Sequence, residues 1–577
     1  MKILLNKKFL LVFAAIVLFA LLTKAQVPDK FKNLPPFKLR AEILSSLNKP
    51  HVHKLNDMRC SDNAPCLKTQ TTLGGSNFEE GDKILQTRDG GFVVCGQTFS
   101  DDGDFSVPPA NNGDAYVAKY NKFGKLEWTK TYGGTGVEVF NDISQTPDGG
   151  YIATGSASSN DGDVSGNHGG NDVWLVKLGA SGNIEWQKCY GGTGDEFGNA
   201  IVQTFYGGYA ITTFTNSNDG DVSGNHNTDG NFDGWFIQVA PKGKLLFQHC
   251  YGGSNFDGFF AMVPSDFGSF ILLGASGSND GDVSGNHGNG DAWVVKVNAF
   301  GKIVWQKCVG GSGIEGDGNN CITTTADGNV VIDGYSNSPD GDINAQNDTV
   351  VSYLAKLNSA TGNIIWSKSF AEPRYRAGAG VFSTRDGGIV ETGFSAGNGF
   401  DNTTYNVLVS KINKNGKEEW YKILGGSDFD GGVAGYETFN GDLNILCQTA
   451  STDGDVKNNH GIVDEWIIKL GRCGGRLDNE NSVNANEDRT VTKNNEGINN
   501  QVIKLYPNPA KDVLKIEGLN ASAKTTLSLF NVSGKMVEQS TTVGETYTFN
   551  LQKLAAGSYY ITIESDKKMT TLKFVKE

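Results

Sequence analysis

Two nearly identical acidic segments carry the side chains best suited to hold a cation. Residues 160–172 read NDGDVSGNHGGND, and residues 279–291 read NDGDVSGNHGNGD. Each places oxygen-bearing side chains at positions 1, 3, 5 and 12 of a loop and glycine at position 6, the spacing with which a twelve-residue loop wraps oxygen ligands around calcium. The candidate ligands are Asp161, Asp163, Ser165 and Asp172 in the first segment and Asp280, Asp282, Ser284 and Asp291 in the second.

A metal-free interpretation competes with calcium. Asn, Asp, Ser and Gly also organise loops through hydrogen bonds from side chain to backbone, and position 12 is Asp rather than the longer bidentate Glu. Related loops are incomplete, because Lys457 replaces the serine in one and the loops at Asp102 and Asp340 lack the closing acid. A catalytic site is one asymmetric constellation, whereas this segment recurs, so we interpret it as part of the scaffold and keep calcium as the alternative. Four histidines lie in these loops, and packing is favoured over zinc for each: His168, His226, His287 and His460.

The recurrence extends to the whole central region. An apolar or aromatic residue followed by Gly-Gly occurs at Leu73, Tyr132, Tyr190, Tyr251, Val309 and Leu424, with a degenerate copy near Phe370. Each unit before the last holds four apolar runs joined by glycine-containing turns, the count of an up-and-down propeller blade. The sequence therefore predicts an all-β fold, a seven-bladed β-propeller of four-stranded antiparallel blades.

The last unit has only three strands before the pattern stops at Leu470. Residues 66–75 align with the fourth strand of another unit, residues 183–192, so we expect an N-terminal strand to complete the final blade and close the ring. In this alignment Cys66 and Cys473 occupy positions that are two residues apart in other units, which predicts a disulfide between them. Cys60 is the competing partner for either. The equivalent thiols of successive outer strands are expected to be unpaired: Cys189, Cys250 and Cys308.

Composition sets the remaining organisation. Residues 1–25 combine lysines, an apolar run and small residues, as a secretory signal peptide does. We predict an N-terminal lead-in over 26–65, the propeller over 66–473, a polar flexible linker over 474–500 and a small C-terminal β-sandwich over 501–577. The net charge of −14 argues against nucleic acid and anionic membranes as partners.

The C-terminal region resembles a known family. The segments LYPNPAKDVLKI (505–516), LFNVSGKMV (529–537) and LAAGSYYITIESDKKMTTLKFVKE (554–577) are similar to the type A C-terminal sorting domain of the bacterial type IX secretion system. The resemblance implies export by signal peptide, then transport by the type IX secretion machinery across the outer membrane to the cell surface or the medium. In many members of the family the domain is removed and the protein is attached to surface lipopolysaccharide.

Two classes of function follow for the propeller. We favour a monomeric, non-enzymatic binding or adhesion protein for a glycan or protein ligand, with calcium as the one candidate cofactor and no catalytic residue assigned. The sixth unit replaces its Gly-Gly entry with FAEPRYRAG, where Arg374, Tyr375 and Arg376 are candidates for a ligand patch. The alternative is a propeller enzyme, either polysaccharide-active or a dehydrogenase of the quinoprotein type, whose Gly-x-x-x-Trp signature the segments NSATGNIIW and NAFGKIVW resemble. No sequence motif of metalloproteases, serine hydrolases or P-loop proteins supports it.

Overall fold

The computed structural model describes residues 64–473 apart from 106–112, 205–206, 228–229, 317, 344–349, 372–375 and 397–404. It also describes residues 504–576 apart from 507–509, 520, 522–523, 532–535, 555–556 and 566–567. This part of the chain is all-β, with a single 3-10 turn, η2 (Asp266–Gly268), as its helical element. None of its helices is long and apolar enough to span a membrane.

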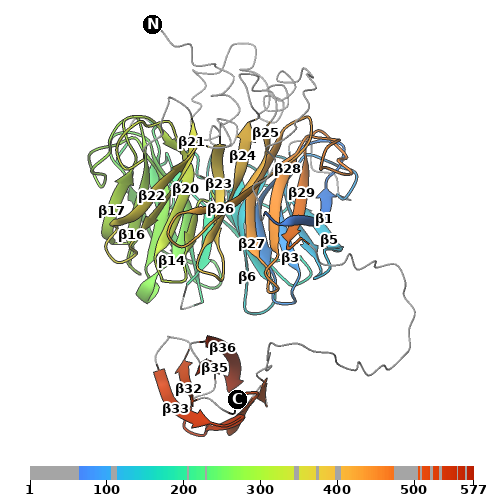
Figure 1. Ribbon diagram of the computed structural model, residues 1–577. Coiled ribbons are helices and arrows are strands. Elements are labelled where there is room, and N and C mark those ends of the chain that lie inside the picture. The colour runs from blue at the N-terminus through green and yellow to red at the C-terminus, as the bar shows by residue number, and fades with distance from the viewer. Residues whose placement is uncertain are drawn as a thin grey trace. The chain divides into compact units, whose positions relative to one another are not determined.

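Residues 66–471 form seven antiparallel sheets, one for each sequence repeat (Figure 1). The first four in chain order are β2–β5 (Glu79–Gln86, Phe92–Thr98, Asp114–Tyr120, Leu126–Tyr132), β6–β9 (Glu138–Gln145, Tyr151–Ala157, Asp172–Leu178, Ile184–Tyr190), β10–β13 (Ala200–Gln203, Tyr209–Thr215, Asp233–Val239, Leu245–Tyr251) and β14–β17 (Asp257–Pro264, Phe270–Ser276, Asp291–Val297, Ile303–Val309). The next two are β18–β22 (Glu315–Gly316, Ile322–Thr324, Val330–Ser336, Val351–Leu357, Ile364–Phe370), whose first strand is split, and β23–β26 (Arg376–Ser383, Ile389–Ala396, Tyr405–Ile412, Glu418–Leu424). The last sheet contains β27–β29 (Asp430–Glu437, Leu443–Thr449, Asp464–Gly471) and β1 (Cys66–Leu73).

The cores lie between successive sheets. In β8 every residue is buried, because both faces of the strand are covered, whereas the outer strand β9 alternates between exposed and covered positions. One hydrophobic cluster joins Val93 of β3 to Phe140 of β6 and Trp174 of β8. Each sheet packs on the next in this way, and β2 of the first complete sheet also contacts β27 of the last.

The N-terminal strand completes the last sheet. β1 pairs antiparallel with β29, with Thr72 opposite Trp466. The indole of Trp466 donates a hydrogen bond of 2.9 Å to the side chain of Gln70, as Trp174 does at 3.0 Å to Gln187 within its own sheet. The predicted strand pairing is therefore confirmed.

A disulfide joins Cys66 to Cys473, with Cα atoms 5.0 Å apart. It is the pair that the alignment of repeats predicts. The three outer-strand thiols predicted to be unpaired, Cys189, Cys250 and Cys308, are free. The competing Cys60 lies outside the described residues, as do the predicted signal peptide and linker.

The chain divides into two compact units, 1–476 and 477–577. The second unit holds two antiparallel sheets that share one core, which contains Leu514 and Phe549 from one sheet and Leu527 and Ile561 from the other. Its strands are β30 (Lys504–Tyr506), β31 (Val513–Glu517) and β34 (Thr546–Asn550) in one sheet, and β32 (Lys524–Asn531), β33 (Met536–Val543), β35 (Gly557–Ser565) and β36 (Lys568–Lys576) in the other.

Candidate functional site: the acidic loops between sheets

The acidic loops bind the backbone of the Gly-Gly connections. In the sheet β6–β9 the loop after β7 packs on residues 133–137, the connection that enters the sheet. The amide of Thr135 donates to Asp161 Oδ1 at 2.8 Å, and the amide of Gly133 donates to Asp163 Oδ2 at 3.3 Å. Ionised carboxylates are strong acceptors for backbone N–H groups that have no partner in a strand. The first two acids of the loop thus accept hydrogen bonds from the backbone amides of the connection between two sheets.

The same pattern recurs in six of the seven sheets, in the residues that the structure describes. The position-1 acid accepts from the residue after Gly-Gly in every case, through Ser76–Asp102, Thr135–Asp161, Thr193–Asp219, Ser254–Asp280, Ser312–Asp340 and Ser427–Asp453. The loops at Asp102 and Asp340 do so without the closing acid that the calcium spacing requires. The recurring acids therefore have a role that needs no metal.

The remaining candidate ligands face other partners. Ser165 Oγ accepts from Gln187 at 2.6 Å, and Asp172 Oδ2 accepts from the amide of His168 at 3.1 Å. The second loop repeats this arrangement, with Asp280 on Ser254, Asp282 on Gly252, Ser284 on Gln306 and Asp291 on His287. Throughout the described ranges, no group of three or more His, Cys, Asp or Glu is placed to hold a metal ion. The hydrogen bonds of these loop side chains run to backbone and side-chain donors of the protein itself.

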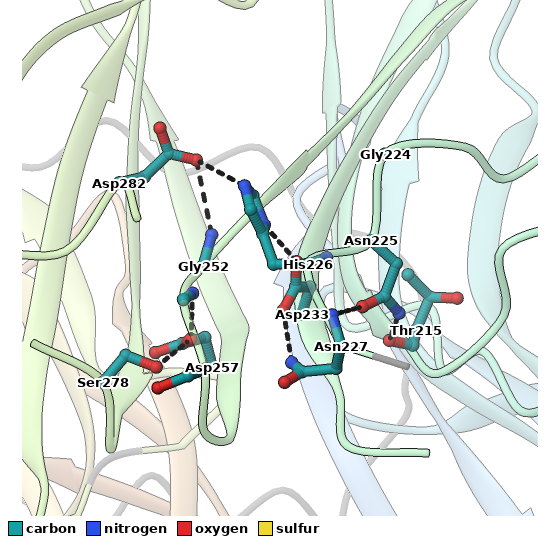
Figure 2. Close-up of polar contacts among 12 residues, drawn as sticks. Thr215, Gly224, Asn225, His226, Asn227, Asp233, Gly252, Asp257, Ser278 and Asp282 are labelled. Carbon is teal, nitrogen blue, oxygen red and sulfur yellow. Dashed lines mark hydrogen bonds and ion pairs between the residues drawn. The ribbon is translucent and has the colours of Figure 1, made fainter. Parts of the chain in front are cut away.

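The four loop histidines each pair with a buried aspartate. His226 Nδ1 lies 2.6 Å from Asp233 Oδ2, and its Nε2 lies 3.9 Å from Asp282 of the next sheet (Figure 2). His168 lies 2.6 Å from Asp172 in the same way. Burial opposes the charged form of His168, but the hydrogen bond to Asp172 raises the pKa of this imidazole. The histidines thus bridge loop and sheet.

A second carboxyl group, which was not predicted from the sequence, lies beside each of these aspartates. In five connections the first residue of a third strand faces an acid at the start of the next sheet's first strand or, for Glu196, just before that strand. Both members of each pair are at least nine-tenths buried: Glu79 and Asp464, Asp114 and Glu138, Asp172 and Glu196, Asp233 and Asp257, Asp291 and Glu315. The first glycine of Gly-Gly makes room for them. A Cβ on Gly252 would lie 2.7 Å from Asp233 Oδ1 and 2.8 Å from Asp257 Oδ2.

Burial changes the acidity of these paired groups. Desolvation, with the nearby charge of Glu138, raises the pKa of Asp114 to about 7. Desolvation also raises the pKa of Asp257 to about 6, although hydrogen bonds from Ser276 and Ser278 oppose the change. A sequence signal for the pairs existed, since an acid recurs four residues after the second glycine of each complete Gly-Gly motif.

The opposite ends of the strands carry ordinary ion pairs. Lys177 is buried in the third strand of its sheet and lies 3.0 Å from Asp148 in the first hairpin turn and 3.2 Å from Glu185 at the start of β9. Hydrogen bonds from Thr146 and Gly150 and the ion pair with Lys177 lower the pKa of Asp148 to about 2. Four other sheets repeat the pair of lysine and turn aspartate, as Lys119–Asp89, Lys296–Asp266, Lys356–Asp327 and Lys411–Asp386.

Arg376, one of the three residues of the predicted ligand patch, does not lie at the surface. Arg376 is fully buried as the first residue of β23, where five other first strands carry an acid. Its guanidinium pairs with Glu391 and, at 2.6 Å, with Glu418, and it lies 4.8 Å from the ring of Phe370. The prediction for Arg376 was wrong because a charge that replaces an acid at a sheet interface is enclosed by that interface. Arg374 and Tyr375 lie outside the described residues.

A cavity of 180 Å³ lies among the first strands of several sheets. Lys83 in this cavity donates to Asn320 at 3.0 Å and lies 3.5 Å from Asp142. Asn320 in turn donates to the backbone carbonyl of Asp82 at 2.7 Å. The polar groups at this point are therefore joined across sheets that are distant in sequence.

Residues 504–577 match the family model described as "Secretion system C-terminal sorting domain". No curated protein sequence matches the chain. A similar solved structure is PorZ, described as an essential bacterial surface component of the type IX secretion system of Porphyromonas gingivalis, with 12% identity over 88% of this chain and 60% of that chain and a TM-score of 0.36. Others are a puromycin hydrolase (10% identity, 65% and 51% covered, TM-score 0.37) and a glucose dehydrogenase (10%, 56% and 96%, 0.31). The chain covers less than two thirds of the PorZ and puromycin hydrolase chains. The family match indicates export through the type IX secretion system to the cell surface or the medium.

Proposed function

We propose that the seven sheets form a closed seven-bladed β-propeller and that residues 504–576 form a β-sandwich. The contact of β2 with β27, the pairing of β1 with β29 and the disulfide between Cys66 and Cys473 support closure. A closed arrangement leaves no long unpaired sheet edge. The core shared by the two C-terminal sheets supports a sandwich.

The propeller is a non-enzymatic binding or adhesion module, displayed at the cell surface or released after export. The observation that supports this proposal is the hydrogen bonding of the acidic loops to the backbone. The side chains whose types suited them to metal chemistry are hydrogen-bonded to backbone between sheets in repeat after repeat, as Asp161 is to Thr135. Such loops form a rigid support on which variable surface residues can bind a glycan or a protein.

The test is a glycan array probed with the full mature chain, in calcium and in chelator. We expect retention on a defined set of glycans that is unchanged by chelator, because the loop acids are already satisfied by backbone donors. Retention that requires calcium would contradict the metal-free loops. Absence of retention on glycans and on extracted surface proteins alike would contradict the binding function.

The alternative is a propeller enzyme, and the cavity at Lys83 and Asp142 is where the described residues offer a place for it. Incubation of the chain with polysaccharides, followed by an assay for reducing ends, tests this function. Release of reducing ends that is lost in Asp142→Asn would favour the enzyme.

Export depends on the C-terminal unit in this proposal, through its interaction with the type IX secretion machinery. A chain truncated after residue 476 is expected to accumulate in the periplasm. Fractionation of cells that produce the full and truncated chains measures this. Attachment to surface lipopolysaccharide after tail removal would appear as a slowly migrating form of the full chain only.

A further inference from the structure

One oxygen in each of two buried carboxyl pairs has no hydrogen-bond partner. Asp172 is fully buried, and its Oδ2 accepts from the amide of His168, whereas its Oδ1 has no donor. Asp172 Oδ1 and Glu196 Oε2 both border the space that a Cβ on Gly191 would fill. A buried carboxylate oxygen without a donor destabilises the folded state, so a donor is expected here.

Glu196 cannot supply that donor while it is ionised. Its Oε2 accepts from the amide of Gly192 at 2.9 Å, and its Oε1 accepts from the hydroxyl of Thr215 at 2.5 Å. Glu196 is also fully buried. Two buried negative charges that border the same small space repel each other strongly, and the usual outcome is that one of them binds a proton.

The pair of Asp291 and Glu315 repeats this geometry. Asp291 Oδ1 is buried and has no hydrogen-bond donor. It borders, with Glu315 Oε2, the space that a Cβ on Gly310 would fill. Glu315 Oε2 accepts from the amide of Gly311 at 3.0 Å, and Ser336 donates to its other oxygen at 2.6 Å.

In one connection an uncharged amide side chain replaces one of the two carboxyl groups. In the connection between β23–β26 and the last sheet, Asn406 of β25 takes the position that Asp172 and Asp291 have in their third strands, and its Oδ1 lies with Asp430 Oδ2 against Gly425. An amide has the shape of a protonated carboxyl group and carries its own donor. This position therefore accepts an uncharged group opposite a carboxylate.

We propose that Asp172 and Glu196, and likewise Asp291 and Glu315, each share one proton in the folded protein, carried on Oδ1 of the aspartate and donated to Oε2 of the glutamate. Folding takes the proton up from water, and the resulting hydrogen bond joins the third strand of one sheet to the segment that enters the next sheet. These pairs make the contact between sheets stable in mild acid and weaker in alkali.

Other charged groups face the pair of Asp172 and Glu196 and influence its titration. His168 contacts Asp172 from its own loop, and Asp221 approaches from the loop of the next sheet. The thiol of Cys189 on β9 also lies within the field of Asp172.

His287 contacts Asp291 in the second pair. Asp342 of the next sheet also faces Asp291 and is itself 3.1 Å from Lys307, and the thiol of Cys308 lies in the field of the aspartate.

The direction of the pH dependence follows from burial. Desolvation raises the pKa of Asp172, Glu196, Asp291 and Glu315 above their ordinary values, although hydrogen bonds to each group oppose it. A group whose pKa is raised on folding contributes stability below its unfolded pKa, and this contribution is lost as pH rises through the folded pKa. One proton held only by the folded state changes the folding equilibrium constant about tenfold per pH unit.

The test compares urea unfolding of the full chain between about pH 6 and about pH 9. Wild-type protein is expected to lose stability as the pH rises. Where both pairs titrate, its folding equilibrium constant is expected to fall about a hundredfold more per pH unit than that of the Asp172→Asn and Asp291→Asn double variant. Asp219→Asn is the matched control, because Asp219 is an exposed acid beside the same pair and accepts from Thr193. That variant is expected to keep the wild-type pH dependence.

Proton release upon unfolding gives a second measurement that does not require the variants to be stable. Wild-type protein unfolded in weakly buffered urea near neutral pH is expected to release protons, and Glu196→Gln serves if Asp172→Asn does not fold. An identical pH dependence in wild type and double variant, or no proton release from wild type, would overturn the proposal. Restoration of wild-type stability at about pH 9 by calcium would also overturn it, since a cation would then join the pair.

Discussion

Removal of the disulfide between Cys66 and Cys473 is the perturbation whose effect the structure defines best. The two cysteines are 407 residues apart in sequence, so the bond closes a very long loop in the unfolded chain. The chain-entropy relation gives about 6 kcal/mol of stabilisation at 25 °C for a loop of this length. Because measured effects are often smaller than this relation, we expect a double variant Cys66→Ser and Cys473→Ser to lose roughly 3 to 6 kcal/mol of unfolding free energy.

The assay is urea unfolding followed by tryptophan fluorescence, since Trp466 packs beside the strand that the disulfide anchors. Wild-type protein in reductant should match the double variant. Cys250→Ser removes a free thiol that is not fully buried and is expected to change stability by less than about 1 kcal/mol.

The double variant should still fold. β1 pairs with β29 from Cys66 to Leu73 without the covalent link, and Leu73 is fully buried. A loss below about 1 kcal/mol would refute the reasoning, because it would mean that the unfolded chain gains little freedom when the bond is absent.

Three further predictions test other parts of the structure. Gly191→Ala should cost about 1 to 3 kcal/mol in urea unfolding, because its Cβ would displace the buried carboxyl of Glu196, and a loss within 0.5 kcal/mol would contradict that packing. Lys177→Met should cost about 1 kcal/mol at neutral pH, since its partners can return to water, and the cost should shrink as pH falls through about 2, where Asp148, whose pKa is lowered, loses its charge. Buried Cys95, whose thiol pKa burial raises well above its ordinary value, should resist a thiol reagent in native protein and react after unfolding; rapid labelling in the native state would contradict its burial.

The sequence was sufficient for the strands, their pairing and the disulfide, because each repeat supplied an aligned copy of the others. Cys66 and Cys473 could be paired since their equivalents lie two residues apart in an intact hairpin. The spacing of acids in the loop left both a metal-free scaffold and calcium open, because position in a loop does not tell which way a carboxylate points. Asp161 points to a backbone amide of the preceding connection, and only the folded contact of the two segments reveals it.

Other features required the packing of separate repeats. Asp172 and Glu196 belong to different sheets, and nothing local in either segment shows that they meet, although the acid after each Gly-Gly was a visible signal. Arg376 was predicted to lie at the surface because its repeat lacks the Gly-Gly motif of the others. In the structure it occupies the buried position of the missing acid, where Glu391 and Glu418 neutralise it.

The pairing of β1 with β29 also sets an order of events during synthesis and transport. The partner of Cys66–Leu73 is Asp464–Gly471, so nearly the whole repeat region must be made before the first strand finds its neighbour. Until then its backbone groups are exposed to other chains, and contacts of such long sequence separation form slowly. A chaperone that shields the N-terminal strand would therefore have to stay bound until the last sheet is made. The sorting unit at residues 504–577 is synthesised only after all residues of that sheet.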